Sequence, residues 1–193
     1  MRPMRKRASY QDLLDLPEHV VGEIIEGELY TSPRPSSPHA FAAAAMTSDL
    51  FGSFSGPPGQ SGRIGGWWIL AEPELHLGED VVVPDLAAWR RERMPRMPSV
   101  AYFKLRPDWV CEISSPSTAA LDRDRKLGVY ARESIPHGWI VDPLAKTLEI
   151  FRLKGDAWVT VATHAGAERV KAEPFEAVEL ELQSWWLDAE PTP

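Results

Sequence analysis

The sequence predicts an α/β fold, with a mixed central β-sheet flanked by helices (α/β/α) and a C-terminal hairpin extension. Segments with strand and helix patterns are interleaved along the chain, and short strands separated by turns follow them. The chain has 193 residues, 44% hydrophobic and 25% charged, which is typical of one globular domain. We therefore expect a single domain over residues 1–193, with its core at about 9–183 and frayed tails.

The expected elements follow the hydrophobic periodicity and the positions of glycine and proline. Eighteen prolines favour short elements, because proline interrupts helices and strands. In chain order we expect a helix at 9–16, a strand at 23–30 bent at Gly27, a helix at 39–51, strands at 67–77, 81–89 and 108–114, a helix from Ser117 or Thr118 to about Ser134, and strands at 137–141, 148–153, 158–163 and 178–182.

Cysteine content and hydropathy limit the class of protein. Cys111 is the only cysteine, which excludes an intrachain disulfide and a zinc site built from cysteines. No apolar run approaches the length of a membrane span, and no apolar segment follows the basic start at residues 1–7. We expect a cytoplasmic protein that does not enter a membrane.

Charge is distributed unevenly along the chain. The formal net charge of −7 argues against a general nucleic-acid coat protein. Residues 1–84 carry a net charge of −5 and residues 133–193 a net of −6, whereas residues 85–132 carry +4. The middle third is therefore where we expect an anionic substrate to bind, although most of its arginines could equally be solvated surface.

Two carboxylates interrupt apolar strands. Asp85 lies in Val-Val-Val-Pro-Asp-Leu-Ala-Ala, and Glu112 lies in Trp-Val-Cys-Glu-Ile. A buried carboxylate needs a partner, a proton or a metal. If the two strands are neighbours, the carboxylates converge and can bind Mg²⁺. For either residue alone, a strand-end turn at Asp85 or an arginine partner for Glu112 is at least as good an explanation.

The helix after the second strand carries three polar residues on one face. Asp122, Lys126 and Tyr130 follow one another at a spacing of four residues. A lysine that points toward a two-carboxylate site can orient the attacking water and offset charge in the transition state. Helical geometry alone favours the simpler alternative, a solvent-exposed pair of Asp122 with Lys126.

Taken in order, several blocks resemble the Uma-type family of putative restriction endonucleases, in the PD-(D/E)XK nuclease superfamily. The resemblance runs from about residue 9 to 183, and its most specific part is Ser114–Thr118 together with Asp122 and Lys126. The blocks are Glu-Ile-Ile-Glu-Gly-Glu-Leu at 23–29, Pro38-His39, Val-Pro-Asp at 83–85, Glu-Ile-Ser-Ser-Pro-Ser-Thr at 112–118, Asp122, Lys126 and Tyr130, and Trp-Ile-Val-Asp-Pro at 139–143.

This resemblance implies a restriction endonuclease-like fold, a divalent metal (Mg²⁺ or Mn²⁺) and hydrolysis of DNA phosphodiester bonds. Asp85 and Glu112 match the acidic positions of the motif and would bind the metal. The motif's lysine would fall at position 114, where this chain has Ser114. The resemblance therefore requires Lys126, on the helix, to be the catalytic lysine.

Further site residues are expected around this centre. Glu28 or Glu23 could supply another acidic metal ligand. Alternation along one strand puts Glu26 and Glu28 on one face and Glu23 on the other, and we favour Glu28 because it adjoins Gly27. His39 opens a helix, where an imidazole and backbone N–H groups could meet a phosphate, although a lone histidine there is more often a packing residue.

The remaining expectations concern substrate contacts and assembly. Arg90 and Arg91 begin a basic segment, Arg90–Arg106, that would contact phosphates, and Asp122 and Tyr130 would also contact the substrate. The alternative function is a catalytically weak or inactive homodimer that binds nucleic acid or serves as a scaffold, joined through the tryptophan-rich C-terminal half. A third possibility is hydrolysis of another phosphodiester, such as RNA or a small nucleotide.

Overall fold

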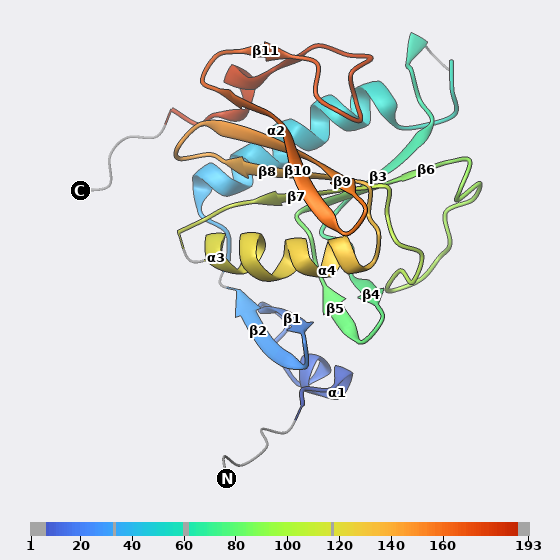
Figure 1. Cartoon of the computed structure of the whole chain (residues 1–193), viewed down its shortest axis with the longest axis vertical. Coiled ribbons are helices and arrows are strands. Elements are labelled where there is room, and N and C mark those ends of the chain that lie inside the picture. Colours follow the sequence, from blue (N-terminus) through green and yellow to red (C-terminus); the bar gives the residue numbers. More distant parts are fainter. Residues whose placement is uncertain (1–6, 33, 60–61, 117, 189–193) are drawn as a thin grey trace.

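The structure is a computed structural model, and it describes residues 7–32, 34–59, 62–116 and 118–188. A six-stranded mixed sheet has helices on both faces, as predicted from the sequence (Figure 1). A smaller four-stranded sheet lies toward the N-terminal end of the molecule and carries α1 (Tyr10–Leu14) beside it. The candidate site described below lies where the two sheets meet.

The larger sheet has the strand order β10-β9-β8-β7-β6-β3. Its strands are β3 (Trp67–Ala71), β6 (Leu86–Arg90), β7 (Trp109–Ile113), β8 (His137–Asp142), β9 (Thr147–Lys154) and β10 (Ala157–Ala165). All neighbouring pairs are antiparallel except β7 and β8, which are parallel. A parallel pair needs a crossover connection, and here the helical segment between the two strands provides it.

The smaller sheet has the order β2-β1-β5-β4, and a two-stranded ribbon lies near the C-terminus. These strands are β1 (Val21–Ile25), β2 (Glu28–Ser32), β4 (Leu75–Leu77), β5 (Asp80–Val82), β11 (Arg169–Val170) and β12 (Leu180–Glu181). The expected meander of β8, β9 and β10 is present, whereas the strand expected at 178–182 is reduced to β12 followed by the 3-10 helix η3 (Leu182–Trp185).

The helices form the two outer layers. The long helix α2 (Ser37–Phe54) covers one face and buries Ala42, Met46, Leu50 and Phe54, which recur every four residues. The other face is covered by α3 (Ala119–Leu121), the π-helical turn η2 (Asp122–Lys126) and α4 (Leu127–Arg132) (Figure 1). Thr118 is the N-cap of α3, and Ser117, the other expected cap, lies outside the described residues. In the part of the chain described, no helix combines the length and apolarity needed to cross a membrane.

The tryptophans of the C-terminal half belong to the core. Trp139, Trp185 and Trp186 are buried, and the indole N–H of the half-buried Trp158 donates to the carbonyl of Leu127. These side chains therefore help to fill the core, and the expected homodimer stays a prediction.

The single strand expected at 23–30 is wrong, because the chain reverses at Glu26 and Gly27. Both residues have positive φ values, 55° and 81°. Such a left-handed pair makes a tight hairpin turn, for which glycine is well suited. The result is the antiparallel hairpin of β1 and β2, in which Glu23 pairs with Tyr30 and Ile25 with Glu28.

The strands expected at 67–77 and 81–89 are each two strands in different sheets. The first is interrupted at Glu72, which has a φ of 47°, and at the following Pro73. The second is interrupted at Pro84, which has no N–H to donate to a sheet. Asp85 therefore lies at the junction of the two sheets, directly before β6.

Candidate active site

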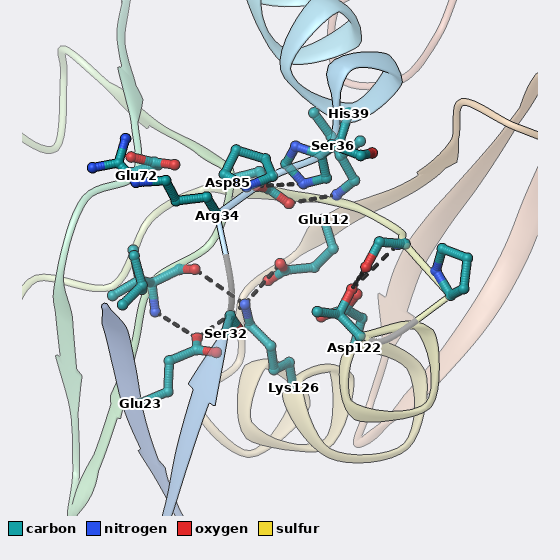
Figure 2. Close-up of a pocket in the computed structure, with 17 residues that line it drawn as sticks. Glu23, Ser32, Arg34, Ser36, His39, Glu72, Asp85, Glu112, Asp122 and Lys126 are labelled. Atoms are coloured by element: carbon teal, nitrogen blue, oxygen red, sulfur yellow. Dashed lines mark hydrogen bonds and ion pairs between the residues drawn. The ribbon is translucent and has the colours of Figure 1, made fainter. Parts of the chain in front are cut away.

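A pocket of about 370 Å³ opens where the two sheets, the start of α2 and η2 meet (Figure 2). Its lining is rich in charged side chains, and the acidic ones outnumber the basic ones. The acidic residues are Glu23, Glu72, Asp85, Glu112 and Asp122, and the basic residues are Arg34, His39 and Lys126.

Asp85 and Glu112 lie on neighbouring strands and line this pocket together. The antiparallel register of β6 and β7 pairs Leu86 with Cys111, so one residue further along, Asp85 lies opposite Glu112. The Oδ2 atom of Asp85 accepts a hydrogen bond of 2.6 Å from the N–H of Ile113, and Oδ1 lies 3.1 Å from His39 Nε2. The two carboxylates that interrupt apolar segments are therefore brought together by strand pairing.

Lys126 reaches the same pocket from η2. Its Nζ atom lies 2.7 Å from Glu112 Oε2 and 2.9 Å from Glu23 Oε1, and it donates to the carbonyl of Val83 at 3.1 Å. Both Lys126 and Asp122 are buried, at 3% and 4% exposure, so the expected solvent-exposed pair is wrong. The reason is tertiary, because η2 packs its polar face onto the junction of the sheets.

Tyr130 and Lys126 together hold the Glu112 carboxylate. The hydroxyl of Tyr130, fully buried, donates to Glu112 Oε1, while Lys126 binds Oε2. Figure 2 shows Glu112 directed toward Lys126 and His39 directed toward Asp85. Asp122 accepts a hydrogen bond from the side chain of Thr118 at the start of the same helical segment.

Two carboxylates of the pocket, Glu112 and Asp122, have raised pKa values. Burial raises the pKa of Glu112 well above its usual range, and the charges of Asp122, Asp85 and Glu23 raise it further, against the opposing effect of Lys126. Burial also raises the pKa of Asp122 to about 6, although Lys126 and the Thr118 hydrogen bond oppose the shift. Several carboxylates therefore lie close together in the pocket, and their burial favours the protonated forms of Glu112 and Asp122.

His39 lies in the pocket wall at the first turn of α2. Burial lowers its pKa, but the hydrogen bond and charge of Asp85 outweigh that effect, so the pKa is raised overall. Its Nδ1 atom is buried and has no hydrogen-bond partner among the described residues. The predicted position of His39 at the site is therefore observed, and its visible contact is with the Asp85 carboxylate.

The two candidate glutamates of the first hairpin are placed differently. Glu23 is 4% exposed and lines the pocket, whereas Glu28 is exposed, accepts a hydrogen bond from Tyr30 and does not line it. The expectation that favoured Glu28 assumed one continuous strand. In the hairpin, the register puts both glutamates on one face, with Glu28 at the distant turn end.

Arg90 and Arg91 lie at the opposite end of β6 from Asp85. Five residues of strand at about 3.3 Å each separate the two ends by roughly 16 Å. The guanidinium of Arg90 stacks 4.4 Å from the centre of the Trp67 ring, and that of Arg91 lies 3.3 Å from the centre of Trp68. The structure therefore does not bring the two arginines to the pocket.

Two further arginines of the basic segment also have partners outside the pocket. Arg93 forms an ion pair of 2.7 Å with Asp108, and Arg106 donates to the carbonyl of Ser134. Two other pocket residues, Arg34 and Glu72, were not predicted from the sequence. Glu72 could have been found from its place in a Glu-Pro break between two apolar strands, but Arg34 lies in a proline-rich turn with no comparable signal.

The sequence and the fold match known proteins. The family model Uma2, described as "Putative restriction endonuclease", matches residues 8–184. The chain belongs to this family. A crystal structure of a "putative nuclease belonging to DUF820" from Anabaena variabilis has the same fold, with a TM-score of 0.72. The two chains are 23% identical, and the match covers 93% of this chain and 99% of the other. No curated protein matches.

These findings confirm the resemblance and the restriction endonuclease-like fold predicted from the sequence. At the level of the family, the protein is a nuclease, an enzyme class that acts on nucleic acid.

Proposed function

We propose that this protein is a metal-dependent endonuclease that hydrolyses DNA phosphodiester bonds in the pocket at the sheet junction. The observation that supports this most is the buried contact of Lys126 with Glu112 in the pocket that Asp85 also lines. Two carboxylates and one lysine are the residue types that the PD-(D/E)XK motif requires. In this proposal Lys126, on the helical segment, replaces a lysine at position 114 of the strand.

The charge of the pocket supports a cation as cofactor. Carboxylates crowd around Lys126, and burial, together with the charges of neighbouring carboxylates, raises the pKa values of Glu112 and Asp122. Without a cation, such a pocket would repel a phosphodiester. Oxygen donors are also the ligands that Mg²⁺ and Mn²⁺ prefer.

Asp85 and Glu112 would bind the metal. The Glu112 carboxylate would then contact both the metal and Lys126. Among the described residues, no group of three or more acidic, histidine or cysteine side chains is arranged to hold a metal ion, so water and phosphate oxygens would have to supply the remaining ligands. When bound, it would activate water and withdraw charge from the phosphate.

The protein's own side chains have separate roles in this proposal. Lys126 orients the attacking water and offsets the charge that develops on the phosphate. His39 holds the Asp85 carboxylate, and Tyr130 holds that of Glu112. The N-terminus of α2, where Ser36 and His39 line the pocket, adds the positive end of a helix dipole on the side where a phosphate would enter.

The test is cleavage of supercoiled and linear duplex DNA with Mg²⁺ or Mn²⁺, comparing wild type with Asp85→Ala. We expect metal-dependent cleavage by the wild type only. Equal cleavage by both proteins would exclude the proposed site. Parallel assays with RNA and with small phosphodiesters separate DNA from the other possible substrates.

The second candidate is a nucleic-acid-binding or scaffold protein without catalysis. It is favoured by the saturation of Lys126, whose three N–H donors are already matched by Glu112, Glu23 and Val83. Calorimetric titration with Mn²⁺ distinguishes the two functions. Binding that disappears in Asp85→Ala and in Glu112→Gln supports the nuclease, whereas no such binding supports the scaffold.

A further inference from the structure

We infer that Glu23 is a positioning residue that holds Lys126 in place, and that it is not a metal ligand. This inference rests on the proposed function, since the reaction that Glu23 would affect is phosphodiester hydrolysis at the same pocket. It assigns the first hairpin of the chain a part in the active site.

Glu23 accepts contacts from two donors at the sheet junction. Its Oε1 atom accepts a hydrogen bond of 2.7 Å from the N–H of Val83 and also lies 2.9 Å from Lys126 Nζ. Two donors on one oxygen compete with coordination of a cation by that oxygen. Glu23 therefore joins β1 to the link between β5 and β6 and to the lysine, and its geometry is that of an anchor.

Lys126 directs its N–H donors at three acceptors, of which Glu23 is one. An ammonium group has three N–H donors, and here they meet Glu112, Glu23 and the Val83 carbonyl. In the proposed reaction Glu112 also binds the metal, which weakens its hold on Lys126. Glu23 and Val83 then keep the ammonium in the pocket while the third N–H becomes available to a water molecule.

The ion pair of Lys126 and Glu23 is buried. The side chains of Lys126 and Glu23 are only 4% and 5% exposed. Removing one partner from a buried ion pair leaves an uncompensated charge, whereas removing both charges is much better tolerated. A substitution that keeps the shape of Glu23 is therefore the appropriate probe, and a double variant controls for folding.

The test is Glu23→Gln, which retains the oxygen that accepts from Val83 but removes the charge that faces Lys126. With a duplex DNA substrate and Mn²⁺, we expect kcat to fall by about 10- to 100-fold, as for loss of a supporting contact. The KM for DNA and the Kd for Mn²⁺, measured by calorimetry, should stay within about threefold. Glu18→Gln, at an exposed position before β1, is the matched control and should change none of these values.

A double-substitution cycle shows whether Glu23 acts through Lys126. In a Lys126→Met background, adding Glu23→Gln should change kcat by less than about twofold, because the group that Glu23 positions is already absent. Circular dichroism and urea unfolding verify that each variant is folded, and the double variant leaves no unpaired buried charge at this pair.

Three results would overturn the inference. A Kd for Mn²⁺ weakened by more than about tenfold in Glu23→Gln would make Glu23 a ligand. An unchanged kcat in folded Glu23→Gln would leave it a purely structural residue. Independent, multiplicative effects in the cycle would mean that it does not act through Lys126.

A wild-type protein that cleaves no phosphodiester overturns the proposed function, and Glu23 is then judged without activity. An unchanged Kd for Mn²⁺, together with urea midpoints in which Glu23→Gln destabilises the wild type but not Lys126→Met, would support the anchoring contact. Equal destabilisation in both backgrounds would overturn it.

Discussion

The two ends of β6 differ in how their charges are compensated. At the Arg90 end, arginines stack on Trp67 and Trp68, and Asp108 accepts hydrogen bonds from the N–H of Arg90 and the guanidinium of Arg93. At the Asp85 end, four buried or half-buried carboxylates crowd around one lysine, and the pKa of two of them is raised.

The contrast between the two ends of β6 shows that the local charge of the sequence is a poor guide to where an anionic substrate binds. The middle third of the chain has a net charge of +4, yet its arginines are largely matched by aromatic rings, carbonyls and carboxylates. In the pocket, by contrast, five acidic side chains lie with three basic ones, and burial raises the pKa of Glu112 and Asp122. Clustered carboxylates with raised pKa values, an arrangement suited to a cation, are the stronger indication of function.

The largest expected effect comes from breaking the pocket at Glu112. Glu112→Gln keeps the shape of the side chain but removes the charge that binds Lys126 and the proposed metal. We expect single-turnover DNA cleavage to fall by about 10³-fold or more. Calorimetry should detect no comparable Mn²⁺ binding. Cleavage within tenfold of wild type would remove Glu112 from the proposed metal site.

A smaller effect should follow from removing the charge of Asp122, which is disfavoured first by burial and then by the charges of Asp85 and Glu23. The pKa of Asp122 is raised to about 6 in the folded protein from an ordinary value of 3.8, so its stabilising contribution is complete below the ordinary value and is lost as the pH rises through about 6. Asparagine does not ionise, so the Asp122→Asn variant does not lose stability as the pH rises through this range. We expect the variant to be more stable than wild type by about 1–2 kcal/mol at pH 8.

Urea unfolding at two pH values checks this expectation. At a pH of about 3 the advantage of Asp122→Asn should be gone, because this pH lies below the ordinary pKa and the carboxyl is then protonated in both the folded and the unfolded protein. A variant that is less stable than wild type at pH 8 would show that the Thr118 hydrogen bond outweighs the repulsion.

The smallest effect is expected at the opposite end of the strand. Arg90→Gln removes the stacking on Trp67 and should lower the free energy of unfolding by about 0.5–1 kcal/mol. Because this end lies roughly 16 Å from Asp85, DNA cleavage should stay within about threefold of wild type. A large loss of cleavage with an unchanged unfolding curve would instead place Arg90 in the substrate path.

Much of the site could be predicted from the sequence, because the cost of burying a carboxylate in an apolar segment can be recognised from neighbouring residues. Asp85 and Glu112 were identifiable since each interrupts an apolar segment, where a carboxylate is costly without a partner. The Pro-Asp break, the Ser114–Thr118 block and the spacing of Asp122, Lys126 and Tyr130 also carried the resemblance to the family. The α/β pattern predicted the layered fold for the same reason, since periodicity is a property of neighbouring residues.

The choice between Glu23 and Glu28 could not be made in this way. Alternation predicts faces only within one uninterrupted strand, and the left-handed turn at Glu26 and Gly27 reverses the chain between the two glutamates. A two-residue turn therefore changed which side chain reaches the pocket. The same applies to the prolines and Glu72, which divided two expected strands between two sheets.

By itself, the sequence determined which residues are costly to bury and which family the chain resembles. Which partners the charged side chains find depends on residues far apart in the sequence, so these contacts could be identified only in the folded chain. Lys126 meets Glu112 and Glu23 across gaps of 14 and 103 residues, and no local pattern distinguishes it from an exposed lysine on a helix. The arginines of the middle third look like a phosphate-binding segment until their tryptophan and carboxylate partners are in place.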